Sequence, residues 1–424
     1  MVRCQRMRRQ YYYTEKPKQL MDLPMDIVVD ILLRLPVKSL CCIRRVSKSL
    51  LKTVDSLSFV KQHTLSLIAA TSHAVQVPQL MCFALTSLHG EDEDFATLQS
   101  LKYDGSALTE DKYAFSVSRS NPIRTDYRLY FVFYNLFCFG WEDENCLLIN
   151  PLREGEVLRL PTSNNQQLTN NGPDSEVQIG SNWYGMGFDS ITSTYKIVRV
   201  SEIVKKKRYG YYSRIGMVAH ILVLGTNLWR EIPSVPPGGL NCPCICAYGD
   251  MHWLKRRVSR GAGKSHIISF DFKKEEFYWT PTPPKLHKHS YLNILTLRGS
   301  MAFVETCSSP GGMNIEIWVL KDYAKKEWTR EYTIKVDMHP KFGLKDATCG
   351  EWEHGIFFND FDNCFNSYGA TRFFLDLRCA SINPVICPLE THEYTNIMSY
   401  TGSFISLKDY GNLGDANEPR ELVT

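Results

Sequence analysis

The clearest hydrophobic pattern in the chain lies near its N-terminus. Five aliphatic residues recur there at the spacing that places them on one wide face of an α-helix: Ile27, Val28, Ile31, Leu32 and Leu35. Pro24 stands where a first-turn proline is tolerated. Pro36 ends the predicted helix, because a residue that precedes proline is pushed out of the α region.

Two further short helices are predicted directly after this one, over residues 37–43 and 46–54. Three helices of this length cannot bury all of their apolar surface among themselves. We therefore expect part of that surface to face a partner.

After His63 the helical periodicity disappears and short alternating runs separated by turn residues replace it. The most regular runs predict β-strands of four to seven residues over 195–200, 219–224, 266–272, 314–319 and 372–375. No amphipathic run of helical length interrupts them. The pattern therefore predicts that this larger part of the chain is all-β.

The strand pattern also repeats. A strand, a polar turn and an apolar residue that opens a second strand recur at intervals of about 50 residues, with one longer interval. The residues that open the second strand are Val157, Trp229, Phe277, Trp328 and Ile382. Such a period predicts a kelch-like β-propeller of six or seven blades, with the ring closed by strands from both ends of the region.

Bulk composition excludes several classes of protein. The 424 residues carry a net charge of only +4, which supports neither a nucleic-acid partner nor an acidic substrate. No apolar run approaches the roughly 18 residues of a membrane helix, and no signal-peptide pattern follows the basic N-terminus. We therefore expect no membrane association, a location in the cytoplasm or nucleus, and free thiols at the fourteen cysteines.

Two short motifs resemble chemical sites, and both have a simpler explanation. Cys242, Cys244 and Cys246 alternate as residues of one strand face would, without the paired spacing of zinc ligands, so we interpret them as packing. The segment 261–265 mimics the end of a phosphate loop, but it lies between two strands, which favours a hairpin turn. No catalytic motif is present, and we expect no metal and no cofactor.

Residues 19–63 resemble an F-box. The resemblance is carried by Leu23-Pro24, Ile31-Leu32, the run from Arg34 to Leu40, Arg45-Val46-Ser47-Lys48 and the segment 59–63. One position departs from the family pattern, because Leu50 stands where the family usually carries Trp, which predicts looser packing of the third helix. The resemblance implies that eight residues form or support the contact with a Skp-family adaptor: Leu23, Pro24, Ile31, Leu32, Leu35, Pro36, Leu40 and Val46.

Most of residues 130–407 resemble the F-box-associated domain of plant F-box proteins. The segments 149–151, 185–189, 227–230, 249–254, 268–271 and 316–320 carry this resemblance, and 400–407 resembles the closing strand. The predicted organisation is a basic tail (1–18), a three-helix F-box (19–63), a β-propeller-like domain (64–411) and a C-terminal tail (412–424). The predicted fold class is therefore α plus all-β.

Together the two resemblances imply a non-catalytic substrate receptor of a Skp–cullin–F-box ubiquitin ligase. Its partners would be the adaptor, through it a cullin and a RING subunit, and an unidentified substrate protein. Aromatic and arginine side chains make interface anchors, so the predicted substrate contacts are Trp183, Tyr184, Tyr211, Tyr212, Arg256 and Arg257. Two alternatives stay open, an F-box scaffold that acts without cullin and a propeller enzyme.

Overall fold

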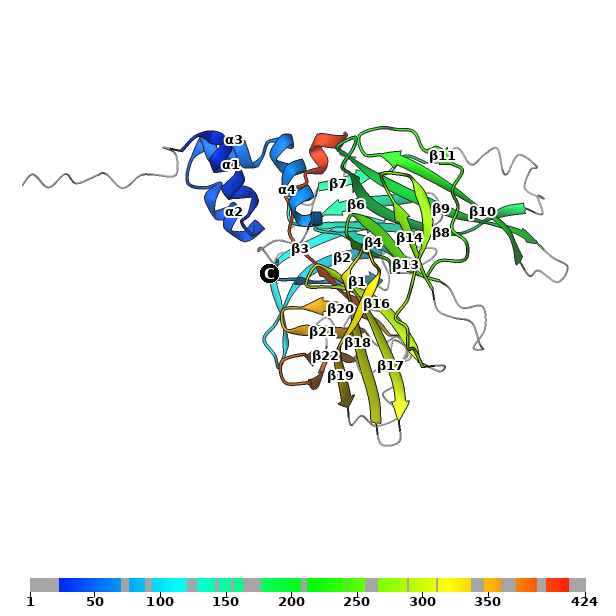
Figure 1. Ribbon diagram of the computed structural model, residues 1–424. Helices are drawn as coiled ribbons and strands as arrows, with labels where there is room; N and C mark the ends of the chain where they lie inside the picture. Colours follow the sequence, from blue (N-terminus) through cyan, green and yellow to red (C-terminus); the bar gives the residue numbers. More distant parts are fainter. Residues whose placement is uncertain are drawn as a thin grey trace, which may run out of the picture.

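The structure is a computed structural model. It describes residues 23–69, 76–87, 94–119, 128–141, 145–153, 156–162, 177–206, 212–241, 243–255, 266–287, 290–309, 312–336, 347–359, 371–386 and 394–411. Four helices come first, and a ring of antiparallel sheets follows (Figure 1). This arrangement confirms the predicted fold class of a helical module followed by an all-β propeller.

The helical module consists of α1 (Met25–Leu33), α2 (Val37–Ile43), α3 (Lys48–Val54) and α4 (Leu57–Ala69). Pro36 separates α1 from α2, as predicted. The third helix begins two residues later than predicted, because the Ser47 side chain accepts a hydrogen bond from the Leu50 backbone N–H and caps it.

The predicted limit of helical structure at His63 is wrong. A fourth helix, α4, continues to Ala69. Its buried residues Phe59, Val60, His63 and Thr64 include two polar side chains, which hide the apolar periodicity of the helix in the sequence.

Each of the six described sheets has four antiparallel strands and forms one propeller blade. Blade 1 contains β1 (Gln79–Ser87), β2 (Asp94–Tyr103), β3 (Leu108–Arg119) and β24 (Tyr394–Tyr400). Blade 2 contains β4 (Arg128–Phe133), β5 (Leu136–Trp141), β6 (Asn145–Asn150) and β7 (Glu156–Arg159). Blade 3 contains β8 (Val177–Asp189), β9 (Thr194–Lys206), β10 (Tyr212–Val223) and β11 (Arg230–Ile232).

The remaining blades follow in chain order. Blade 4 contains β12 (Ile245–Ala247), β13 (Asp250–Leu254), β14 (Ile267–Asp271) and β15 (Glu276–Thr280). Blade 5 contains β16 (Tyr291–Leu297), β17 (Ser300–Ser309), β18 (Gly312–Asp322) and β19 (Glu327–Val336). Blade 6 contains β20 (Thr348–Trp352), β21 (Gly355–Asn359), β22 (Thr371–Asp376) and β23 (Ser381–Ile386).

The ring closes within blade 1. Strand β24, from the C-terminal part of the chain, pairs antiparallel with β1, so that Met398 lies opposite Met81. The predicted closure by strands from both ends is thus confirmed, but the closing strand is 394–400 rather than 400–407. Residues 401–406 form no strand and lead into the short 3-10 helix η4 (Leu407–Tyr410).

The repeated anchor residues of the sequence lie at equivalent places in successive blades. Val157, Phe277, Trp328 and Ile382 are in the last strand of their blades, and Trp229 directly precedes β11. Two of them also make the same contact between blades: the indole Nε1 of Trp229 donates to the Pro161 carbonyl, and that of Trp328 to the Pro281 carbonyl, at 2.7 and 2.8 Å. The anchors therefore mark the outer part of five of the six blades, and the structure settles the predicted six or seven blades at six.

The helices and the blades share one hydrophobic core. Buried residues of the helical module, such as Val28 and Phe59, belong to the same cluster as Phe133 of β4, Tyr195 of β9 and Phe404 near the C-terminus. Among the described helices, none is both long and apolar enough to cross a lipid bilayer.

Candidate functional site

Six large apolar side chains stay exposed on α1, on α3 and in the residues beside these helices. We call this set the docking face; it comprises Leu23, Met25, Ile27, Ile31, Val46 and Leu51. Ile27 and Ile31 are one helical turn apart on α1, so they share one side of that helix. Figure 1 shows α1 to α3 on the outer side of the module, with α4 between them and the blades. The docking face is therefore an apolar surface that the rest of the described chain leaves uncovered.

The eight predicted adaptor-contact residues divide by burial. Leu23, Pro24, Ile31 and Val46 are exposed, and Leu35 and Pro36 are partly buried. Leu32 and Leu40 are fully buried and pack in the core of the module. Leu32 and Leu40 therefore support the helices that carry the docking face and present no surface of their own.

Leu50, the departure from the family pattern, is also part of the module core. It is 3% exposed and belongs to the same cluster as Val28, Leu32 and Leu40. The departure from the family pattern therefore lies inside the module and is not itself part of the docking face.

Helix α4 attaches the module to the propeller. The Thr64 hydroxyl is hydrogen-bonded to the hydroxyl of Tyr195 in β9 at 2.7 Å, and both groups are buried. The His63 ring packs edge-on against Phe404 at a centroid distance of 5.8 Å. An ion pair adds a contact nearer the surface, because Asp55 lies 2.7 Å from Arg44 and 3.9 Å from Arg153 of the propeller.

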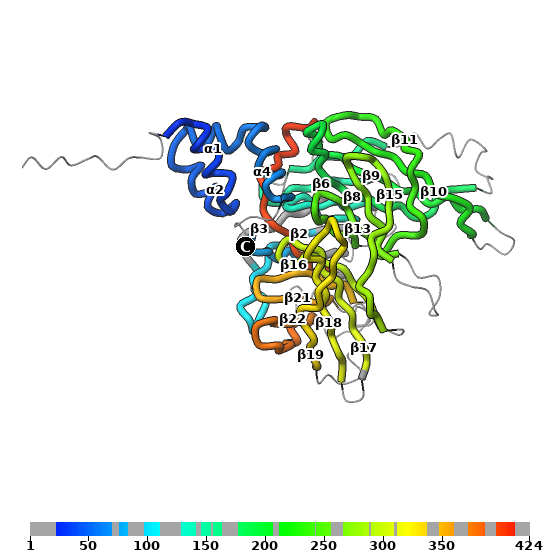
Figure 2. The backbone as a smooth tube through the Cα atoms, in the orientation of Figure 1, coloured from blue at the N-terminus to red at the C-terminus, as the bar shows by residue number. Residues whose placement is uncertain are grey.

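The C-terminal segment 401–410, which we call the strap, runs between α4 and blade 2 (Figure 2). Its backbone is held by side chains of blade 2: Asn150 Nδ2 donates to the Ile405 carbonyl at 2.9 Å, and the Leu407 N–H donates to a Glu156 carboxylate oxygen at 2.6 Å. The Ser406 hydroxyl donates to the other Glu156 oxygen at 2.8 Å. These bonds fix the strap that His63 packs against.

Burial determines the protonation state of His63 in the joint between module and propeller. It lowers the pKa of His63 to about 4, so the imidazole is neutral at physiological pH. A neutral ring suits this position, because its neighbours Phe59 and Phe404 are aromatic hydrocarbons. The joint between module and propeller is therefore formed mostly by apolar packing and buried hydroxyl groups.

Comparison with protein families agrees with this two-part architecture. Residues 80–349 match the family model described as an F-box associated beta propeller domain, and residues 20–62 match the F-box domain. The chain belongs to the plant F-box proteins that carry an F-box-associated β-propeller.

Curated relatives of this F-box protein come from Arabidopsis thaliana. An F-box/LRR-repeat protein is 24% identical over 395 residues, which cover 89% of this chain and 83% of the relative. The F-box protein CPR1 is 22% identical over 74% of this chain and 73% of its own length. An F-box/kelch-repeat protein is 24% identical over 74% of this chain and 79% of its own length. The similarity therefore spans the F-box and the propeller together.

The F-box lies over one end of a central cavity in the propeller. This cavity has a volume of about 970 Å³. It is lined by the innermost strand of each blade, namely β24, β4, β8, β12, β16 and β20, and by residues of α1 and α4. Glu351 of β20 lies on its wall, and burial raises the pKa of that carboxyl to about 7. The cavity is thus a mixed polar and apolar space enclosed partly by the F-box.

The predicted substrate contacts fall into three groups. Trp183 is buried against the cavity, and Tyr184, at 3% exposed, is packed in the core beside Tyr130 with the Arg199 guanidinium over its ring. The prediction that Trp183 and Tyr184 are exposed surface anchors is therefore wrong, because both are buried side chains of β8. Tyr212 is half exposed, as a contact residue must be. Tyr211, Arg256 and Arg257 lie outside the described residues.

The β9–β10 hairpin offers an exposed surface that the sequence pattern revealed only in part. Tyr212 and Ile215 are both exposed on β10, and the basic residues Lys205 and Lys206 lie opposite on β9. Figure 1 shows the far ends of β9 and β10 projecting away from the helices. Ile215 was not predicted, because a single isoleucine in an alternating strand carries no sign of its exposure.

The structure describes only part of the two remaining motifs, the cysteine run 242–246 and the segment 261–265. Cys244 is buried, and its thiol donates to the Tyr130 carbonyl at a sulfur–oxygen distance of 3.4 Å. Cys246 is half-buried and packs against the same core, which agrees with the packing interpretation for these two thiols. Cys242 and the segment 261–265 lie outside the described residues.

Proposed function

We propose that this protein is the substrate-recognition subunit of a Skp–cullin–F-box ubiquitin ligase. The observation that carries the proposal is the docking face, an uncovered apolar surface on a matched F-box domain. Large apolar side chains that stay exposed on a small domain are typical of a protein–protein interface. The partner that fits it is a Skp-family adaptor, which would link the chain to a cullin and a RING subunit.

The apolar side chains of the docking face provide the driving force for this association. Full burial of one such aliphatic side chain contributes about 1.5–3 kcal/mol, before the entropic cost of association is subtracted. Val46 is 75% exposed, so it has most of that contribution still to gain. Leu32 and Leu40 are already fully buried, so their proposed role is to stabilise the packing of the helices.

The joint between F-box and propeller suits the proposed receptor role. Apolar packing against the strap and the Thr64–Tyr195 hydrogen bond hold the two parts together. A receptor held this way keeps a captured protein at a fixed offset from the adaptor, which raises the effective concentration of the target near the ligase. On this proposal the chain itself performs no chemistry, and it acts in the cytoplasm or nucleus.

The target surface is proposed to be the β9–β10 hairpin. Tyr212 and Ile215 supply apolar anchors, and the neighbouring lysines favour an acidic segment of the target. The hairpin also projects away from the F-box, so a target bound there leaves the docking face free (Figure 1).

The proposal is tested by affinity purification of the tagged full-length chain from plant cells, followed by detection of Skp-family adaptor and cullin. Recovery of both with wild type, and of neither with Ile31→Asp combined with Val46→Asp, supports the ligase role. Recovery of the adaptor without cullin would instead support a scaffold that acts outside a ligase. Absence of the adaptor from the wild-type sample would contradict the proposal.

The same affinity purification tests the proposed target surface by comparing two variants of the propeller. Tyr212→Ala with Ile215→Ala is expected to lose co-purifying target proteins and retain the adaptor. Ile191→Ala is the matched control, because Ile191 is an exposed aliphatic residue in the turn between β8 and β9. Equal target recovery from both variants would remove the hairpin from the proposal.

A further inference from the structure

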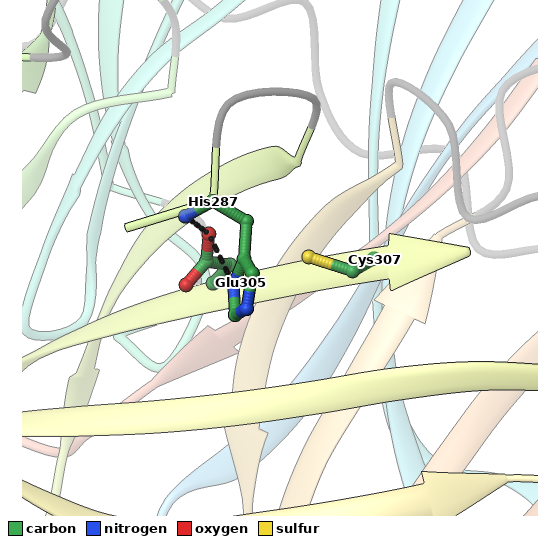
Figure 3. A group of neighbouring side chains, drawn as sticks. All are labelled: His287, Glu305 and Cys307. Carbon is green, nitrogen blue, oxygen red and sulfur yellow. Dashed lines mark hydrogen bonds and ion pairs between the residues drawn. The ribbon is translucent and has the colours of Figure 1, made fainter. Parts of the chain in front are cut away.

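Three side chains with different metal-binding chemistry meet in blade 5. His287 lies in the segment before β16, and Glu305 and Cys307 lie on β17 (Figure 3). One ligand atom of each residue lies within 4.8 Å of the others. Glu305 and Cys307 are two positions apart on one strand, so they share a face of the sheet.

Glu305 is the least expected member of this group, because it is a fully buried carboxylate. Its Oε1 accepts a hydrogen bond from the His287 backbone N–H at 2.6 Å and lies 3.3 Å from the His287 ring Nδ1. Its Oε2 is buried and has no hydrogen-bond partner. A buried carboxylate oxygen without a partner is costly, and a bound cation would remove that cost.

The donor set indicates which cation fits. An imidazole nitrogen, a carboxylate oxygen and a thiolate sulfur are the three ligand types that Zn²⁺ accepts together. The two negative charges of a carboxylate and a thiolate would balance one divalent cation. Hard cations such as Mg²⁺ and Ca²⁺ take oxygen ligands, so a sulfur ligand disfavours them.

We propose that His287, Glu305 and Cys307 form a Zn²⁺-binding site on blade 5, with a fourth position left to solvent. The His287 side chain is 61% exposed, so the ring is free to adjust toward the other two ligands and the cation has a path from solvent. Binding joins the segment before β16 to β17 and fixes the edge of the blade.

The spacing explains why the sequence predicts no metal here. A zinc motif on a short loop places its ligands two to four residues apart. In this chain the pairing of β16 with β17, in which Leu292 lies opposite Glu305, folds His287 back onto a strand that is distant in sequence. Only the hairpin brings the three ligands together.

The test uses Co²⁺ as a spectroscopic substitute for Zn²⁺ on the purified, metal-stripped full-length chain. We expect one equivalent of Co²⁺ to give a sulfur-to-cobalt charge-transfer band that Zn²⁺ abolishes. Cys307→Ser should lose this band, and Glu305→Gln and His287→Ala should each weaken metal binding by about tenfold or more. Cys379→Ser is the matched control, because Cys379 is an exposed thiol in the turn between β22 and β23.

Two results would overturn the proposal. One is a wild-type protein that binds no stoichiometric Co²⁺ or Zn²⁺, which would leave the contact between His287 and Glu305 as the full account of the cluster. Another is a charge-transfer band that persists in Cys307→Ser, which would place the metal at other cysteines. His287→Ala changes an exposed residue, so it keeps the test valid if a core variant fails to fold.

Discussion

The Thr64 hydroxyl of α4 is hydrogen-bonded to the Tyr195 hydroxyl of β9 at 2.7 Å, across the boundary between the F-box and the propeller. Thr64 Oγ1 is also 3.0 Å from the Val60 carbonyl of its own helix. The two bonds anchor α4 at once to its own backbone and to blade 3. The F-box is therefore a fixed extension of the propeller, which is the geometry that a substrate receptor requires.

This hydrogen bond gives a local prediction. Tyr195→Phe should lower the free energy of opening of α4 by about 1 kcal/mol, because the Thr64 hydroxyl loses a buried partner. Hydrogen exchange is the measurement, and α4 amides should exchange about fivefold faster while strands of blade 6 keep their protection. Tyr212→Phe is the control, since that tyrosine is exposed. Unchanged α4 exchange in Tyr195→Phe would show that the hydroxyl pair does not hold the joint.

Substitution of two blade glycines, Gly355 and Gly216, by alanine should change the stability of the propeller to different extents. A Cβ added at Gly355 would lie 2.0 Å from the Leu375 carbonyl oxygen, a backbone atom that cannot move away. A Cβ at Gly216 would meet its nearest neighbour, the end of the Ile203 side chain, at 3.8 Å. Gly355→Ala should therefore destabilise the propeller by about 3 kcal/mol or more, and Gly216→Ala should leave it nearly unchanged. Thermal unfolding checks both, and equal midpoints for the two variants would contradict the blade 6 register.

Acid should weaken the fold through His63. Burial lowers the pKa of His63 to about 4, whereas an unfolded histidine titrates near about 6.5. As the pH falls through this window, the unfolded chain binds a proton that the folded chain refuses, so stability decreases. His63→Phe removes the effect and should gain about 3 kcal/mol relative to wild type between pH 7 and pH 4.

The measurement for His63 is the difference in unfolding free energy between wild type and His63→Phe, determined in urea at several pH values. Taking the difference cancels other titrating groups, such as His252, whose pKa burial also lowers to about 4. A difference that stays constant from pH 7 to pH 4 would mean that His63 is not a neutral buried group in the folded protein.

Local sequence pattern predicted the elements whose residues interact with their neighbours in the chain. The spacing of Ile27 and Ile31 predicted a helix, and Pro36 predicted where it ends. Alternating residues such as those of β14 predicted strands. The regular spacing of the anchor residues predicted the propeller, because each blade is a separate sheet built from one repeat of the sequence.

The missed features depend on contacts between distant parts of the chain. His63 and Thr64 are buried only because Phe404 and Tyr195 lie against α4, so the helix does not show an apolar period. The family resemblance implied a closing strand over 400–407, but Asn150 and Glu156 hold the backbone of the strap in place of a neighbouring strand. The exposed Ile215 and the buried Tyr184 show the same limit, since burial of a strand residue is decided by the blade beside it.

The central claim is that the docking face binds a Skp-family adaptor, and calorimetric titration of the purified full-length chain with that adaptor tests it most directly. Val46→Asp should weaken binding by about tenfold or more, because burying a carboxylate there costs more than the about 1.4 kcal/mol that tenfold represents. Leu228→Asp is the matched control: Val46 and Leu228 are both 75% exposed, but Leu228 lies on the propeller. The account predicts tight binding by wild type and Leu228→Asp with loss in Val46→Asp. Equal affinity of all three, or no binding by wild type, would contradict it.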